Sequence, residues 1–381
     1  MTLGRTGILL IVLLKATLAF GQGNGKLQLH FVDVGQGDGA VLISPRGEVV
    51  LFDHGVLNGC GLVLSYLERL ALTRIDYLIS SHYHADHIGC TEEVLRQFPL
   101  VKEAFDRGGA YSSATFNRYV AAVDSHRTTA TANGTLTLDA TSADPVQITF
   151  VALNGDGLTT QDENSLSLAS VVRYGQFTAE ISGDLTGTTV GAAVDVETQV
   201  GPRVGPLDVY KVHHHCSKYS TNDNWLLATT PTVAIVSAGN GNSYGHPAPD
   251  CLTRLHTANA KTYWTEFGSG AAEPDPAFDM VAGDILIETL ADPVVQTFTV
   301  SYTGGLSDTY RVRGQIPVVP GADGPAHDEP REQVERRRAV QLPAAADDEL
   351  GRVAHPALIR TGRLKSAIQW IANVWAHRRL A

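Results

Sequence analysis

Short alternating runs of apolar and polar residues dominate the first part of this 381-residue chain. In the segment LQLHFVDV (27–34) apolar residues alternate with polar ones, a pattern that predicts a strand with one buried face. Two compact β-rich runs follow at 40–43 and 49–52, separated by glycine-containing turns. Similar runs predict further strands at 75–81, 146–153, 165–175, 177–184, 208–216, 232–239, 261–267, 284–290 and 297–304.

Helical patterns lie between several of these strands. Residues 61–70 are expected to be helical, as are residues 91–98, with Thr91 as the N-cap. Another helix is expected before the strand that ends in three consecutive histidines. The stretch 105–145, rich in Ala, Thr and Ser, is expected to be helix plus loop. Because strands and helices alternate twice, the pattern predicts an α/β fold, an αββα four-layer sandwich over residues 25–304.

The two ends of the chain differ from this domain. Residues 1–21 combine a basic start, an apolar core and small residues near Gly21, as in a cleaved export signal, so we expect a secreted or periplasmic protein. The alternative is a buried first strand. Residues 305–363 are rich in Pro, Gly and charges and are predicted to be a flexible, disordered linker. Residues 364–380 predict a basic amphipathic helix that could touch a membrane, dock on a protein partner or pack back on the domain.

Composition narrows the classes of function. A hydrophobic content of 43% supports a globular core, and a formal net charge of −11 argues against binding to nucleic acid through surface basicity. The four cysteines have no zinc-finger spacing. In an exported protein they could form two disulfides, in one of three pairings.

Three histidines and an aspartate lie within six residues, directly after the strand predicted at 75–81. Alternate residues first point to one side of the turning chain, so His82 and His84 can hold one metal ion. Asp86 and His87, at the start of the next helix, can hold a second ion nearby. The motif lies in the strand–loop–helix context that such a metal site requires, which argues against a chance cluster of surface histidines.

Other strand ends supply further donors. Asp184 follows a strand, where one carboxylate could bridge two ions. His213, His214 and His215 end another strand, and His246 follows a third. Taken singly, each has a structural explanation, but together they predict a dinuclear metal site.

These motifs resemble the metallo-β-lactamase superfamily. HYHADH, then SGD, then a strand ending in paired histidines follow its pattern. More narrowly, FVDVGQGDGAVLI, ISSHYHADHIGC, ENSLSLASVVRYGQFTAEISGDL, YKVHHHCSKYS and NSYGHP resemble, in order, the soluble hydrolase domain of the DNA-uptake protein ComEC. The resemblance covers roughly residues 27–270. It implies the αββα sandwich, two metal ions at one edge, and hydrolysis by a metal-bridging hydroxide.

The resemblance also assigns roles. One of His214 and His215 is implied to be a ligand and the other to contact substrate or relay a proton. We take His214 as the ligand and assign catalytic roles to Asp86, His215 and His246. His213 is expected to be structural. The motifs imply five ligand positions, and His214 is the sixth. The five are His82, His84, Asp86, His87 and Asp184.

Two departures from the family pattern affect the site. Cys216 replaces the glycine that usually follows the histidine pair. An additional histidine ligand of the superfamily is missing, and Asn164 matches the asparagine of the ComEC-like branch in this region. The resemblance implies that Asn164 and His246, which matches the Gly-His-Pro of the family, bind substrate. Fewer imidazoles leave one ion with more oxygen ligands, so we expect two divalent ions, with Zn²⁺ preferred and Mn²⁺ possible.

Two aspartates near the first hairpins are candidates for support of the site. Asp33 and Asp53 end strands that should reach the metal edge, where each could orient a ligating imidazole through its other nitrogen. The alternative for both is turn stabilisation by the carboxylate.

The expected reaction is hydrolysis without a serine or cysteine nucleophile. The leading substrate is a phosphodiester or related phosphate ester, because the resemblance implies nuclease-like chemistry. The acidic charge favours a small phosphoester or nucleotide-like substrate over long nucleic acid. The alternatives are amide or lactone hydrolysis of the β-lactam type and a non-catalytic binding or scaffold protein.

Overall fold

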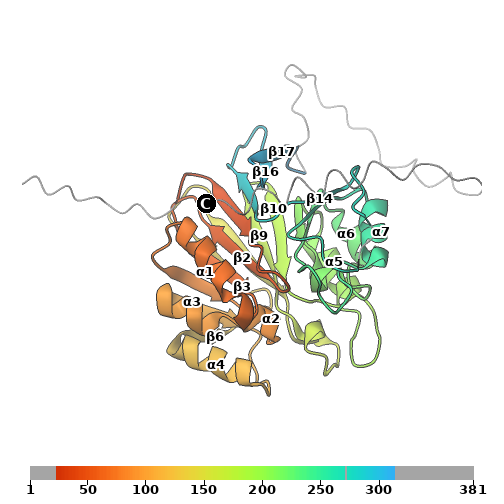
Figure 1. Cartoon of the computed structure of the whole chain (residues 1–381). Helices are drawn as coiled ribbons and strands as arrows, with labels where there is room; N and C mark the ends of the chain where they lie inside the picture. Colours follow the sequence, from red (N-terminus) through yellow and green to blue (C-terminus); the bar gives the residue numbers. More distant parts are fainter. Residues whose placement is uncertain (1–22, 271–272, 314–381) are drawn as a thin grey trace, which may run out of the picture. The chain divides into compact units, whose positions relative to one another are not determined.

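Two β-sheets pack face to face, and helices cover the outer face of each (Figure 1). The computed structural model describes residues 23–270 and 273–313. None of the helices in this described part combines the length and the apolar character that a membrane span requires.

The first sheet has nine strands in the order β17-β16-β15-β1-β2-β3-β4-β5-β6. Strands β3 and β4 of this sheet pair in parallel, with Val50 opposite Tyr77. The strands are β1 (Leu27–Phe31), β2 (Gly39–Ile43), β3 (Val49–His54), β4 (Ile75–Ile79), β5 (Leu100–Asp106), β6 (Arg127–Thr129), β15 (Ile285–Thr289), β16 (Thr297–Tyr302) and β17 (Leu306–Arg311).

The second sheet has eight strands in the order β14-β13-β12-β11-β10-β9-β8-β7. Here β10, β11 and β12 run parallel to one another. The strands are β7 (Thr135–Leu138), β8 (Val146–Ala152), β9 (Ala169–Tyr174), β10 (Phe177–Ser182), β11 (Val209–Lys211), β12 (Val233–Val236), β13 (Lys261–Trp264) and β14 (Asp279–Val281).

Three apolar cores hold the four layers together. The first lies between the sheets and includes Phe31 and Phe177, and the other two pack each sheet against its helices. Burial of large apolar side chains drives this packing. The helices on the first sheet are α1 (Cys60–Arg69), α2 (Ala85–Ile88), α3 (Thr91–Gln97) and α4 (Ala114–Val123), and those on the second are α5 (Glu197–Val204), α6 (Asp223–Thr229) and α7 (Pro249–Thr257).

The cysteines form two disulfides, Cys60–Cys90 and Cys216–Cys251. The first joins the start of α1 to the residue before α3, and the second joins the segment after β11 to α7. The structure thus selects one of the three pairings that the sequence left open.

The predicted αββα sandwich is confirmed, with three local corrections. Thr91 is the first residue of α3 and its hydroxyl donates to the carbonyl of Ile88, so the N-cap position belongs to Cys90. The stretch 105–145 contains strands β6 and β7 as well as α4.

The third correction concerns the end of the domain. The linker predicted from 305 is wrong in its first residues, because β17 pairs antiparallel with β16 and the following Val312 is buried. Residues 314–363 of the predicted linker, the export signal at 1–21 and the helix at 364–380 lie outside the described residues.

Candidate metal centre

The candidate site lies where the carboxyl ends of parallel strands meet. Strands β3 and β4 of the first sheet and β10, β11 and β12 of the second all end at this edge. Asp53 lies near the end of β3, and the segments that follow the other four strands carry further predicted site residues. Loops after the carboxyl ends of parallel strands are common places for active sites.

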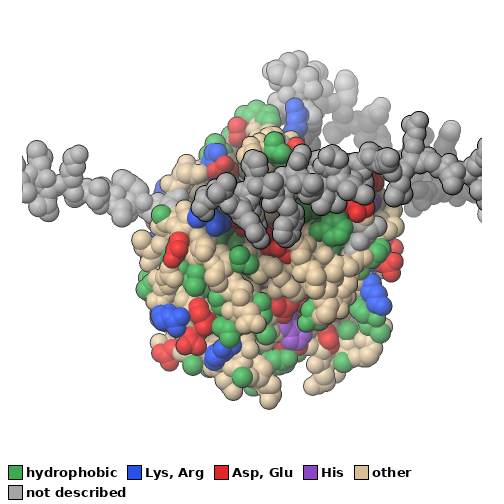
Figure 2. All heavy atoms as spheres, in the orientation of Figure 1, with side chains coloured by type: hydrophobic (Ala, Val, Ile, Leu, Met, Phe, Trp, Pro, Cys, Tyr) green, Lys and Arg blue, Asp and Glu red, His purple; other side chains and the backbone are tan. Residues whose placement is uncertain are grey.

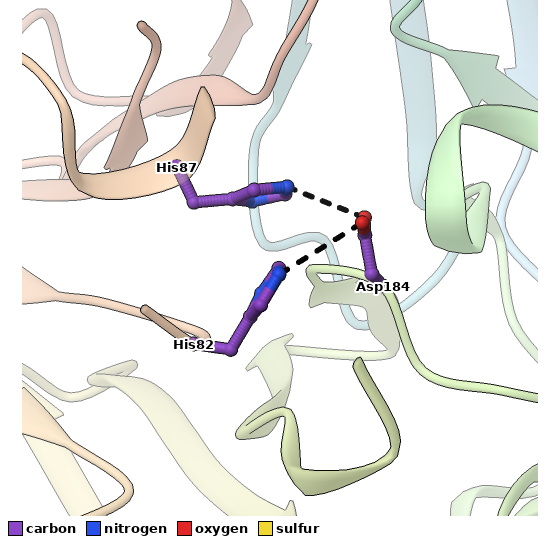
Figure 3. A group of neighbouring side chains, drawn as sticks. All are labelled: His82, His87 and Asp184. Carbon is purple, nitrogen blue, oxygen red and sulfur yellow. Dashed lines mark ion pairs between the residues drawn. The ribbon is translucent and has the colours of Figure 1, made fainter. Parts of the chain in front are cut away.

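His82 and His87 approach Asp184 from the first sheet (Figure 3). His82 follows β4, His87 lies in α2, and Asp184 comes two residues after β10. The His87 Nε2 atom lies 3.3 Å from one carboxylate oxygen of Asp184, and His82 Nε2 lies 3.8 Å from the other. The three side chains are buried and face one another.

A glycine permits this approach of the two sheets. A Cβ atom at Gly183 would lie 2.1 Å from the hydroxyl of Ser81, closer than any real contact. The SGD motif therefore needs its glycine so that β10 can bring Asp184 against the histidine segment.

Asp184 also faces the paired histidines of the second sheet. Its Oδ1 atom lies 3.4 Å from His215 Nε2 and its Oδ2 atom 3.8 Å from His214 Nε2. His215 Nε2 in turn lies 3.4 Å from the carboxylate of Asp86. Asp184 therefore lies between imidazoles from both sheets, the position that a carboxylate bridging two ions would take.

His84 lies on the open side of this cluster. Its Nδ1 atom is 3.0 Å from His82 Nε2, and the two rings meet edge to face. His84 also lines a cavity of about 300 Å³ that exposes Asp86, Asp184, His214 and His215. The structure thus brings together all six residues predicted as metal ligands.

The buried donor atoms of the cluster fit a divalent metal. His87 Nε2, His215 Nε2 and Asp184 Oδ1 are buried without a hydrogen-bond partner among the described residues, although both nitrogens lie within 3.4 Å of that oxygen. Unpaired polar atoms in such a place are costly unless something binds them. Imidazole nitrogens and carboxylate oxygens are the donors that Zn²⁺ and related ions take.

Several groups of three donors are compact enough to hold an ion. In each group, the donor atoms all lie within 4.8 Å of one another. Three of these groups share His87 and two share Asp184, so the site has room for neighbouring ions that share ligands. The groups are His82–His87–Asp184, Asp86–His87–His215, Asp38–Asp53–His87 and Asp38–Asp184–His215.

The electrostatics of the cluster favour positive charge at its centre. Burial opposes the charged form of His215, but Asp184 and Asp38 outweigh burial and raise its pKa to about 10. The pKa of His87 is raised well above its usual value because Asp184, Asp86 and Asp53 likewise outweigh burial. A cation that replaces these protons would meet the same carboxylates.

Asp53 is placed to orient His87. Its carboxylate accepts hydrogen bonds from the backbone N–H of Ser81 (2.8 Å) and from the Ser81 hydroxyl (2.6 Å), and lies 2.9 Å from His87 Nδ1. It therefore contacts the nitrogen of His87 opposite the one that faces Asp184. Such contacts fix the ring orientation of a metal ligand.

Asp33 does not reach the cluster, and the prediction that it orients a ligating imidazole is wrong in this structure. Its carboxylate accepts a hydrogen bond from the backbone N–H of Gly35, and its own N–H donates to Asp284. Strand β1 ends at Phe31, so Asp33 already lies in the turn that leads away. Its contacts fit the alternative expectation, in which the carboxylate stabilises a turn.

Asp38 is a site residue that the sequence reasoning missed. It is buried, its carboxylate lies 3.3 Å from His215 Nδ1, and Lys211 Nζ lies 2.8 Å away. Burial raises the pKa of Asp38, but Lys211 and His215 outweigh that effect and lower it. The available signal was GQGDG itself, which contains an acidic residue in a glycine-rich loop beside the metal edge.

Asn164 and His246 line the entrance to the cluster. Asn164 Nδ2 lies 3.3 Å from His214 Nε2, and the His246 ring lies 5.6 Å from the His214 ring. Both side chains line the same cavity as the cluster. Burial, with His215 and His214 nearby, lowers the pKa of His246 to about 4, so this imidazole is neutral at pH 7.

His213 points away from the cluster, as expected for a structural residue. Its Nδ1 atom lies 2.7 Å from Glu197 and its Nε2 atom 3.3 Å from Glu180, on the helix-covered side of the second sheet. Both carboxylates are fully buried.

A four-layer α/β sandwich with a histidine–aspartate cluster at its strand ends defines a class of metal-dependent hydrolases. Residues 39–240 match the family model of the metallo-beta-lactamase superfamily. The chain belongs to this superfamily, whose fold implies divalent metal ions, typically two.

Two curated relatives show which kind of protein within the superfamily this chain resembles. The chain is 26% identical over 259 residues to ComE operon protein 3 of Bacillus subtilis, covering 63% of this chain and 32% of that protein. It is 28% identical over 234 residues to recombination protein 2 of Haemophilus influenzae, covering 60% of this chain and 26% of that protein. The match thus spans about a third or less of each relative.

Among solved structures, the chain is similar to the metallo-beta-lactamase fold protein YhfI of Bacillus subtilis. The identity is 15%, the TM-score is 0.40, and the match covers 62% of this chain and 96% of that one. Metallo-beta-lactamase SMB-1 matches with 13% identity and a TM-score of 0.35, over 50% of this chain and 78% of that one.

Proposed function

We propose that this chain is an exported hydrolase that uses two divalent metal ions, preferably Zn²⁺, to cleave a small phosphodiester or nucleotide-like phosphate ester. The observation that carries the proposal is the position of Asp184. Its two carboxylate oxygens face imidazoles from both sheets, His87 and His215 on one side and His82 and His214 on the other.

The proposed ligands are His82, His84, Asp86, His87, Asp184 and His214. Bound ions of this kind lower the pKa of a water molecule and neutralise charge that develops on the reacting oxygen atoms. Burial, with the charge of His87 nearby, keeps the pKa of His82 well below its usual value, so its nitrogen is free to donate a lone pair.

Other residues of the cavity would act on the substrate. Asn164 can donate its amide hydrogens to a substrate oxygen, and neutral His246 can donate a hydrogen bond from its ring N–H to the leaving oxygen. His215, bonded through Nδ1 to the carbonyl of Ser237 at 2.9 Å, is held in a fixed orientation facing Asp86. This fixed orientation supports a role for His215 as ligand or proton relay.

The charge of the chain supports a small substrate. The net charge is −11, and the face drawn in Figure 2 shows acidic and basic side chains interspersed over the described residues. A long nucleic acid normally follows a continuous basic track. A short ester needs only the local positive charge of the ions.

Export is supported by two disulfides in the described domain, because disulfides persist in oxidising compartments. The proposal includes the cleaved signal near Gly21. We also propose that the helix predicted at 364–380 contacts a membrane or a protein partner. That helix lies outside the described residues.

The test is hydrolysis of methyl 4-nitrophenyl phosphate by the purified chain, stripped of metal and reloaded with Zn²⁺ or Mn²⁺. We expect turnover only with metal, and its loss in Asp86→Ala. No turnover from protein shown to bind two ions would reject the phosphodiester class. Cleavage of a chromogenic β-lactam or lactone by that protein would establish the amide and lactone alternative instead.

A further inference from the structure

A second cavity opens beside the metal centre. It has a volume of about 430 Å³ and shares His214, Tyr244 and His246 with the cavity of about 300 Å³ that exposes the cluster. Because the two share walls, a substrate whose reacting group lies at Asp184 can extend into the second one. Both volumes fall in the range of ligand-binding pockets, roughly 300–1,000 Å³.

Tyr244 forms the boundary between the two cavities. Its side chain is 68% exposed, and its ring stacks on His246 at an interplanar angle of 15° and a centroid distance of 5.8 Å. Asn242 fixes this loop, since its amide donates to the carbonyls of Gly239 and His246 and its oxygen accepts from the N–H of Tyr244. The tyrosine thus presents a pre-positioned aromatic face next to the reaction centre.

The far wall carries an aromatic ring and a cation. Lys218 Nζ lies 4.8 Å from the centroid of the Tyr219 ring, and both side chains are exposed. Asp250, also exposed, supplies the negative charge of the lining. An aromatic surface combined with one lysine suits a planar group that carries polar or anionic substituents.

We propose that this second cavity binds the nucleoside arm of a nucleotide phosphodiester, with the base stacked against Tyr244 and the phosphate at the metal centre. The inference rests on the proposed function and specifies its substrate. Tyr244 is the specificity-determining residue. Base–aromatic stacking of this kind does not depend on base identity.

Two substrates with the same scissile bond test this subsite. Thymidine 5′-(4-nitrophenyl phosphate) and methyl 4-nitrophenyl phosphate release the same 4-nitrophenol and differ only in the arm that remains. We expect the wild type to show a higher kcat/KM for the nucleotide ester. In Tyr244→Ala the ratio of the two kcat/KM values should fall about tenfold or more, mainly through the KM of the nucleotide ester.

Two variants serve as controls. Tyr244→Phe keeps the aromatic face and should restore the wild-type ratio. Leu227→Ala removes an exposed apolar side chain outside both cavities and should leave the ratio unchanged.

The outcomes separate the subsite from the reaction. Turnover of both esters with equal kcat/KM, or a ratio that Tyr244→Ala does not change, would overturn the subsite and leave the phosphodiesterase proposal standing. If the kcat/KM for phenyl 4-nitrophenyl phosphate equals that for the nucleotide ester, the nucleoside assignment is overturned. Failure to hydrolyse any of the three would reject the proposed function itself.

Discussion

Two aspartates that look alike in the sequence have different positions in the fold. Asp33 follows β1 and Asp53 lies near the end of β3, so from the sequence either could support a metal ligand. The structure places Asp53 against His87 and Ser81, and Asp33 against Gly35. Their tertiary contacts alone distinguish them.

Asp53→Asn should therefore weaken metal binding. The amide keeps one acceptor oxygen but loses the charge that fixes His87, and such outer contacts contribute about 10- to 100-fold in affinity. Competition titration with a chromogenic chelator measures the change. Asp33→Asn is the matched control and should bind metal like the wild type, so equal losses in both variants would contradict this assignment of roles.

His30 makes a separate contribution to the pH dependence of stability. It is 2% exposed in β1 with Nδ1 2.9 Å from the Tyr66 hydroxyl, and burial lowers its pKa to about 4. The folded state therefore binds fewer protons than the unfolded state between the unfolded pKa of about 6.5 and pH 4. Stability should fall as the pH decreases through this range.

Replacement of His30 by Gln tests this expectation. The free energy of unfolding of the metal-free wild type, minus that of the metal-free variant, should be constant above pH 7.5. It should drop by up to about 3 kcal/mol by pH 4, since one pKa unit corresponds to about 1.4 kcal/mol. Denaturant titrations at a series of pH values measure it, and a difference that does not vary with pH would show that His30 does not titrate on unfolding.

At the residue scale, the metal motif was predictable and its surroundings were not. His82, His84, Asp86 and His87 are adjacent in the sequence, so the density of donor groups reveals them. Asp38 depends on Lys211, which is 173 residues away, and no local pattern connects the two.

At the scale of elements, the segment after β11 is held in a strained conformation. His214, His215 and Cys216 have positive φ angles of 50°, 52° and 60°. For residues other than glycine, this left-handed region costs roughly 1–2 kcal/mol each. The Cys216–Cys251 disulfide ties this segment to α7, and the carbonyl of Cys216 accepts from the N–H of Ala248.

We expect that either the disulfide or a glycine at position 216 can keep this segment in its observed conformation. Cys216→Gly with Cys251→Ala removes the tether but also relieves the strain at position 216, and should keep metal affinity near that of the wild type. Cys216→Ala with Cys251→Ala removes the tether and keeps the strain, and should bind metal about tenfold more weakly, since the ligands must be reordered on binding. Equal metal affinities of the two folded variants, measured by chelator competition, would contradict this account.

The pattern predicted most elements of the sandwich because their apolar residues follow the period of a strand or a helix. It missed strands β5 and β14, the short polar-rich strands β6 and β7, and the edge strand β17. β17 reads LSDTYR and is exposed at most positions, so hydrogen bonding to β16 defines it more than burial does. Edge strands of this kind lack the apolar pattern on which the prediction depends.

At the scale of the whole molecule, the site depends on both sheets. The first sheet supplies His82, Asp86 and His87, and the second supplies Asp184 and His215. The sequence suggested this convergence because the donors follow separate strands. Which oxygen faces which imidazole depends on the packing of the two sheets, which no local sequence pattern specifies.

The central proposal is that Asp184 would hold two metal ions together with imidazoles of both sheets. The most direct test is the number of Zn²⁺ ions per chain, measured by mass spectrometry of the elements after removal of metal, reloading and gel filtration. We expect two ions in the wild type, and one or none in Asp184→Ala that retains the wild-type circular dichroism spectrum. A wild type that holds fewer than two ions, or an Asp184→Ala variant that still holds two, would contradict the account.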